Sequence, residues 1–66
     1  MTWAEACAAL LEGKKVTRPH WGGEWIALEK PGTNTCYIRW NTKTLFAPMK
    51  EHLWATDWEV IPNENQ

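Results

Sequence analysis

Apolar residues recur with helical spacing over the first thirteen positions of the chain. They occupy positions i, i+4, i+7 and i+8, namely Trp3, Cys7, Leu10 and Leu11. Alanines, which favour helix, lie between them. Thr2 and Glu5 have the spacing of a capping box, in which their side chains satisfy the free amides of a helix start. Gly13 is the expected stop, so the pattern predicts an N-terminal helix with one apolar stripe.

From Lys15 onward the hydrophobic period changes to two, and Gly, Pro and Asn interrupt the chain at short intervals. The pattern predicts strands near residues 15–18, 24–30, 35–40, 44–47 and 57–61. It predicts turns at 19–23, 31–34 and 41–43, and a loop or single helical turn over 48–53. This is a meander of short strands that follows the helix.

Alternation along the second and third strands divides their side chains between two faces of the sheet. Ile26 and Leu28 share one face of their strand, and the third strand adds Cys36, Ile38 and Trp40. If the registers match, the opposite face carries Trp25, Tyr37 and Arg39. We expect an α+β fold in which the helix packs on a small antiparallel sheet of four to five strands. The aromatic face is free to pack on a second subunit.

Size favours a single domain and an oligomer. We expect residues 1–61 of the 66-residue chain to form one domain, and residues 62–66 to form a polar tail that frays. A chain this short is marginally stable alone, and it offers no closely spaced cysteine or histidine pair for a metal. Cys7 and Cys36 are expected to be reduced and buried. We therefore expect the chain to be stabilised by forming a homodimer or homotetramer.

Charge and composition exclude several functional classes. The formal net charge is −1 and no basic block is present, which argues against a nucleic-acid polymer as partner. Neither a signal peptide nor a membrane span is apparent, so a cytoplasmic protein is expected. The chain has no serine, one aspartate and two widely separated histidines, His20 and His52, which we expect to be exposed loop residues. No catalytic residue, metal or cofactor is predicted.

The chain contains six tryptophans, more than a core this small needs. Trp21 and Trp25 flank the Gly22-Gly23 turn and follow Arg18, an arrangement that could stack a planar base beside backbone amides and a cation for phosphate. The alternative is that both rings fill the core or an interface and that Arg18 and Arg39 only decorate the surface.

Asp57 also has two interpretations. After Thr56, its carboxylate would ordinarily stabilise a turn or cap a helix. It could also bind a ribose hydroxyl.

Four segments in order resemble the phage-type Thoeris anti-defence family. They are Thr2-Trp3-Ala4-Glu5-Ala6, Gly13-Lys14-Lys15-Val16-Thr17-Arg18, Trp21-Gly22-Gly23 and Leu53-Trp54-Ala55-Thr56-Asp57-Trp58-Glu59-Val60. Gly22 stands where that family commonly has asparagine, and the segment between Trp40 and Leu53 is short.

The resemblance implies a small α+β homo-oligomer that sequesters a cyclic nucleotide signal of bacterial immunity, a cyclic ADP-ribose isomer or a cyclic oligonucleotide, without cleaving it. It also implies that Trp21 stacks on the ligand, that Gly22 and Gly23 turn against it, and that Thr56-Asp57 forms part of the pocket wall. Two alternatives remain: an inhibitor that binds a protein through its aromatic face, and an enzyme that degrades the signal.

Overall fold

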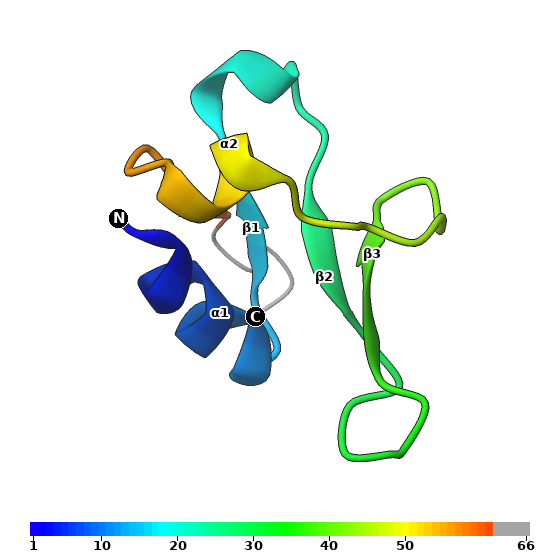
Figure 1. Cartoon of the computed structure of the whole chain (residues 1–66). Coiled ribbons are helices and arrows are strands. Elements are labelled where there is room, and N and C mark those ends of the chain that lie inside the picture. The colour runs from blue at the N-terminus through cyan, green and yellow to red at the C-terminus, as the bar shows by residue number, and fades with distance from the viewer. Residues whose placement is uncertain (62–66) are drawn as a thin grey trace.

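The computed structural model describes residues 1–61 and consists of a helix packed on a four-stranded antiparallel sheet (Figure 1). The elements are α1 (Trp3–Leu11), β1 (Lys15–Thr17), the 3-10 helix η1 (Pro19–Trp21), β2 (Ile26–Glu29), β3 (Tyr37–Trp40), α2 (Lys50–Trp54) and β4 (Glu59–Ile61). The strand order is β3-β2-β1-β4, so the first strand pairs with the last. The α+β fold expected from the sequence is confirmed, whereas the expected tail at 62–66 lies outside the described residues.

The start of α1 forms as the capping box predicts. The Thr2 amide donates to Glu5 Oε1 over 2.8 Å, and the Glu5 amide donates back to the Thr2 hydroxyl over 3.3 Å. At the other end, the Gly13 and Lys14 amides bond to the carbonyls of Leu10 and Ala9, respectively. This is the Schellman arrangement, which Gly13 permits through its φ of 87°.

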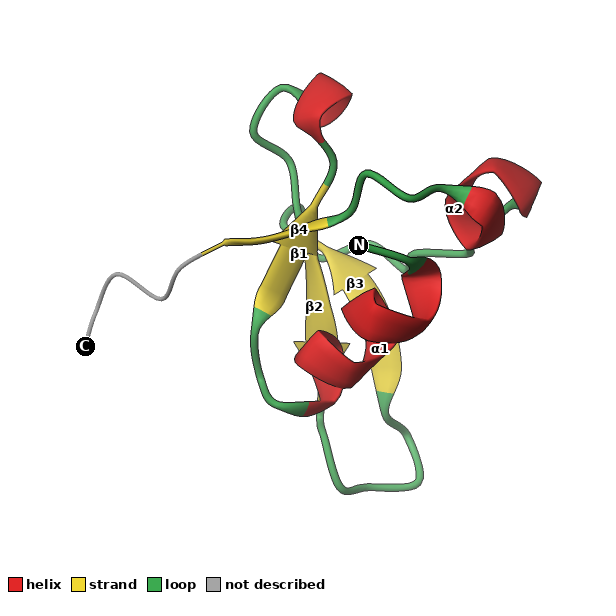
Figure 2. Ribbon diagram, turned by 90° about the vertical axis from the view of Figure 1, so that its left-hand side faces the viewer, coloured by secondary structure: helices red, strands yellow, loops and turns green. Residues whose placement is uncertain are grey.

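The apolar stripe of α1 is only partly as predicted. Leu10 is buried, but Leu11 is 77% exposed, and the buried positions beside Leu10 are Ala6 and Ala9. Because alanine side chains are small, α1 can lie close to the sheet on the side that carries Ala6 and Ala9, and this side faces the core. Figure 2 shows α1 lying across one face of the sheet.

The two faces of the sheet are those expected. Ile26 pairs with Trp40 and Leu28 with Ile38 on the core side, while Ala27 pairs with Arg39 and Glu29 with Tyr37 on the other. Val16 of β1 pairs with Ile26 and is fully buried. The fully or nearly fully buried hydrophobic side chains are Ala6, Ala9, Leu10, Val16, Ile26, Phe46 and Trp58.

Segment 44–47 does not form the expected strand. It makes one isolated bridge, between Leu45 and Arg39, and the Phe46 amide bonds to the Ile38 carbonyl over 2.9 Å. Pro48, which has no amide hydrogen to donate, ends the pairing after a few residues. The segment instead places Phe46 in the core, and Leu45 stays 66% exposed.

Three smaller expectations also need correction. The strands are shorter than predicted, and β3 begins after Cys36, which is exposed rather than buried. The predicted turn at 19–23 contains the 3-10 helix η1. The single helical turn expected over 48–53 is present as α2.

Among residues 1–61, no helix has the length and apolar character needed to cross a membrane.

Candidate functional site

Four of the six tryptophans belong to one aromatic cluster, defined here as Trp3, Trp21, Trp40, Phe46, His52 and Trp58. The ring of Trp58 is central and 2% exposed, with the Trp3 centroid 5.0 Å away and the Trp21 centroid 5.3 Å away. The other two tryptophans lie outside it. Trp54 is 75% exposed on α2, and Trp25 lies on the opposite face of the sheet.

Trp21 sits at the rim of this cluster because of the local sequence around η1. Pro19 fixes the first φ of the 3-10 helix, and the Trp21 amide bonds to the Arg18 carbonyl over 3.0 Å. Gly22 and Gly23 then take φ values of 65° and 98°, which other residues adopt only at a cost. No neighbouring atom lies within 4 Å of where a Cβ would be at either glycine, so the turn borders open space.

The Trp21 ring is half-buried. Its ring centroid lies 4.7 Å from that of Trp40, and it meets the Trp58 ring in a T-shaped arrangement. Trp21 therefore packs against the core and stays partly exposed, and the glycine turn follows it directly in the chain. Both interpretations made from the sequence, core packing and ligand stacking, fit this position, and the ligand-facing role stays a prediction.

Arg18 is the second element of the site, and it is not a surface residue. Its side chain is 12% exposed and lies over the Trp58 ring, 5.8 Å from Cζ to the centroid. Its Nε donates to Asp57 Oδ1 over 2.8 Å, and Nη1 lies 3.8 Å from Glu51 Oε2 of α2. Within the described residues, Nη1 is buried and makes no hydrogen bond.

Asp57 is brought to Arg18 from 39 positions away in the chain. The hydrogen bond from Arg18 is the main reason why the pKa of Asp57 is lowered from its usual value, so this carboxyl is ionised at neutral pH. The expected role in a turn or cap is thus replaced by an ion pair. Thr56 is exposed beside it, and its carbonyl accepts a bond from the Met1 amino group over 3.0 Å.

Trp25 does not join the other predicted site residues. Its indole lies on the outer face of the sheet, with Lys15 Nζ 4.4 Å and Arg39 Cζ 5.4 Å from the ring centroid. Arg39 also donates from Nε to Glu29 over 2.6 Å. The structure therefore separates Trp25 from the group that contains Arg18, Trp21, the glycine turn and Asp57.

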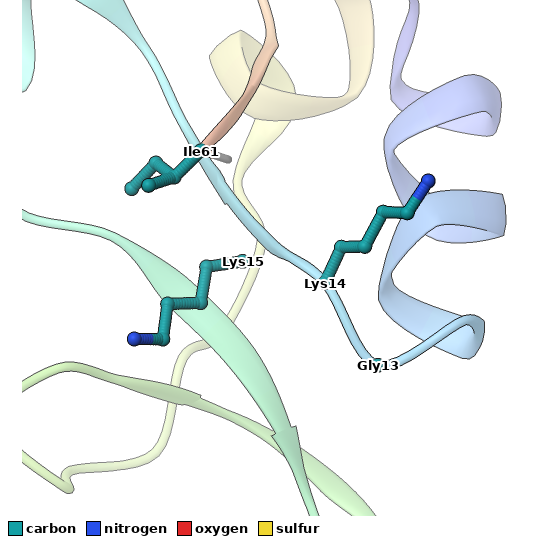
Figure 3. Close-up of a pocket in the computed structure, with 4 residues that line it drawn as sticks. All are labelled: Gly13, Lys14, Lys15 and Ile61. Carbon is teal, nitrogen blue, oxygen red and sulfur yellow. The ribbon is translucent and has the colours of Figure 1, made fainter. Parts of the chain in front are cut away.

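A small pocket lies at the far end of β1, where Gly13, Lys14, Lys15 and Ile61 surround about 70 Å³ (Figure 3). Pockets for drug-sized ligands enclose about 300–1,000 Å³, so this one is too small for a nucleotide. Lys14 in addition pairs with Glu12 over 3.0 Å. In the part of the chain that is described, no three His, Cys, Asp or Glu side chains group closely enough to hold a metal ion.

The comparison with known families decides the assignment. The model of the Thoeris anti-defense 2-like domain, Tad2-like, matches residues 1–61. This chain belongs to the Tad2-like family. Neither a curated protein nor a solved structure matches it. The resemblance inferred from the four sequence segments is confirmed, and the chain is placed among Thoeris anti-defence proteins.

This Tad2-like chain also contains a buried residue that sequence reasoning missed. His52, expected in an exposed loop, is 8% exposed within the aromatic cluster. Its Nδ1 accepts the Met49 amide over 2.8 Å and so closes the start of α2. Burial is the main cause of the lowered pKa of His52. The local sequence carries no signal for this burial, because Met49 and His52 are not the Ser/Thr and Glu/Gln of a capping box.

The thiols of this Tad2-like chain differ in their surroundings. Cys7 is half-buried on α1, and burial raises its pKa, which keeps the thiol protonated and unreactive. Cys36 is exposed in the loop before β3. Cys36 thus contributes nothing to the core, contrary to the expectation from sequence alternation.

Proposed function

We propose that this protein sequesters a cyclic nucleotide signal of bacterial immunity, a cyclic ADP-ribose isomer or a cyclic oligonucleotide, and releases it uncleaved. The match to the Tad2-like family over residues 1–61 carries the proposal. In this view the protein acts in the cytosol of the infected bacterium, where the signal is produced. Neither a nucleic-acid polymer nor a membrane takes part.

The geometry around η1 supports this function. Trp21 is partly exposed, and its ring is held in place by packing against Trp40 and Trp58. A ring held in this way loses little conformational entropy when a purine stacks on it, and such stacking contributes about 1–3 kcal/mol per base. Gly22 and Gly23 beside it leave space for a ligand to approach the backbone.

Oligomerisation is part of the proposal, because Gly22 and Gly23 beside Trp21 border open space that a second copy can cover. The 70 Å³ pocket is well below nucleotide size and lies away from Trp21. A homodimer or homotetramer would complete a pocket from two copies, and it would also cover exposed apolar side chains. Thr56 and Trp25 would then contribute from the pocket wall and from an interface.

Native mass spectrometry of the purified protein tests the proposal most directly. The expected result is a dimer or tetramer that carries a small anionic ligand after expression in cells that produce the signal. Heating the complex should return the nucleotide intact, whereas an enzyme would return a cleaved product. A monomer that binds no member of a panel of ADP-ribose isomers and cyclic di- and trinucleotides would refute sequestration.

One observation favours a second candidate, an inhibitor that binds a protein. Four large apolar side chains are exposed within ten residues: Leu45, Met49, Leu53 and Trp54. Exposed aromatic and apolar groups of this kind often form the centre of protein interfaces. Under this alternative, Trp54→Glu abolishes anti-defence activity in cells and leaves nucleotide binding unchanged. Under sequestration by an oligomer, activity follows nucleotide binding and oligomeric state.

A further inference from the structure

Charges around Arg18 are layered, with the cation inside and the anions outside. The Arg18 side chain is 12% exposed, whereas the side chains of its two carboxylate neighbours, Asp57 and Glu51, are 44% and 66% exposed. A ligand that approaches this end of the molecule therefore meets carboxylate oxygens before it meets the guanidinium.

The net charge of this group disfavours a phosphate. One positive charge on Arg18 stands against two negative charges, on Asp57 and Glu51, which leaves −1. His52 adds no charge at neutral pH, because burial lowers its pKa. The Nη1 atom of Arg18 is itself buried, and Nε is already bonded to Asp57. Arg18 is thus poorly placed to bind a ligand phosphate, the role that its sequence position suggested.

Asp57 is better placed to contact a ligand. Arg18 engages only its Oδ1, which leaves Oδ2 on the more exposed side chain of the pair. The Asp57 carboxylate is bonded to Arg18, which lies over the Trp58 ring, and that ring in turn contacts Trp21, so the contacts place the carboxylate on the same side of the molecule as the proposed stacking surface. An ionised carboxylate is an acceptor only, and its natural partners are hydroxyl and N–H donors.

We propose that Arg18 is a positioning residue that holds the Asp57 carboxylate beside Trp21, and that Asp57 accepts hydrogen bonds from ribose hydroxyl groups of the ligand. This inference rests on the proposed function, which it deepens by naming the part of the nucleotide that this end of the site recognises. The ligand phosphates then lie away from Arg18.

The positioning role is tested first without any ligand, by a double-mutant cycle on thermal unfolding. Arg18→Gln and Asp57→Asn each remove the ion pair and should each lower Tm by about 5 °C. The double variant should fall no further than the worse single variant, because both changes remove the same interaction. Arg39→Gln, on the opposite face, is the control and should add to Asp57→Asn. Additive effects of Arg18→Gln and Asp57→Asn would overturn the positioning role.

The recognition role is tested with two ribose probes, cyclic ADP-ribose and cyclic di-AMP, each compared with its 2′-deoxyribose counterpart by calorimetry. The wild type should bind the better ribose probe about tenfold more tightly than its deoxy form, as expected for a hydrogen bond to a charged group. Asp57→Asn and Arg18→Gln should both remove most of this preference and leave the salt dependence of binding unchanged.

Two outcomes would contradict the recognition role, and they are distinguishable. If Arg18→Gln weakens ribose and deoxyribose probes equally and flattens the salt dependence, Arg18 contacts a phosphate and the inference is wrong. If the wild type binds none of the probes or the wider nucleotide panel, the proposed function fails, and the recognition role of Asp57 fails with it. The unfolding cycle still decides in that case whether Arg18 positions Asp57.

Discussion

The indole N–H of Trp58 donates a hydrogen bond to the backbone carbonyl of His52, 3.1 Å away, inside the core. The bond joins the segment before β4 to α2 and satisfies two buried polar groups at once. A tryptophan can be 2% exposed here only because its polar atom has this partner.

Replacing Trp58 with phenylalanine should therefore destabilise the protein by about 2–4 kcal/mol. The change leaves the His52 carbonyl without its partner and opens space among the surrounding rings. Urea unfolding of Trp58→Phe measures the loss. Trp54→Phe is the matched control, because Trp54 is 75% exposed and its replacement should change stability by less than about 0.5 kcal/mol. Equal losses would mean that Trp58 does not hold the core together.

Neighbouring leucines on α1 should respond very differently to truncation. Leu10 is 2% exposed and Leu11 is 77% exposed, although both lie on the stripe that the sequence pattern marks as apolar. Leu10→Ala should cost about 2–5 kcal/mol as a core truncation. Leu11→Ala should be nearly neutral, because alanine favours helix and no packing is lost. Chemical denaturation of both variants decides between this orientation of α1 and the one predicted from periodicity.

Stability should fall on acidification through the titration of His52. Its pKa is lower in the folded protein than the value near 6.5 expected on unfolding, so the unfolded chain binds more protons between the two values. The contribution is complete above the unfolded pKa and is lost as pH decreases below it. The effect is measured as the free energy of unfolding of wild type and His52→Gln between about pH 7.5 and pH 5, a range that spans the ordinary pKa of histidine.

The control for this experiment is His20→Gln, since His20 is exposed on η1. It should keep the acid sensitivity of the wild type, while His52→Gln should reduce it. Loss of the Asp57 contribution requires more acid, below the usual carboxyl range, because its pKa is lowered as well. If His52→Gln retains the full slope near pH 6, another group is responsible.

Trp21→Ala should abolish nucleotide binding and cost less stability than Leu10→Ala. The prediction follows from the half-buried position of Trp21, whose ring contacts Trp40 and Trp58 and still borders solvent. Calorimetry and thermal unfolding of the same preparation measure both effects. A fall in Tm as large as that of Leu10→Ala would show that the indole serves mainly the core.

Local signals in the sequence predicted the fold better than the site. Thr2 and Glu5 identify the helix start because both capping bonds form within four residues. The two-residue alternation of β2 and β3 likewise gives the correct faces, with Ile26 opposite Trp40. Such features depend on spacing alone and can be recognised without the rest of the chain.

What the sequence could not give depends on contacts between distant segments. The pairing of Arg18 with Asp57 spans 39 positions, and neither residue carries a local signal for the other. His52 is polar in a short segment, so its burial follows only from the aromatic rings that surround it in space. Leu45 and Leu11 show the converse. Both are exposed because no core lies above them, and the sequence pattern does not reveal this.

The order of strands has a consequence for how the chain folds as it is synthesised. β1 lies between β2 and β4, so a strand near the start of the chain waits for a partner made some 45 positions later, as in the pair Lys15 and Ile61. Trp58, the largest fully buried side chain, immediately precedes that late strand. The nascent chain therefore cannot close its core on the ribosome until β4 emerges, and long-range pairing of this kind slows folding. A truncation that removes β4 should leave a collapsed, aggregation-prone chain rather than a smaller domain.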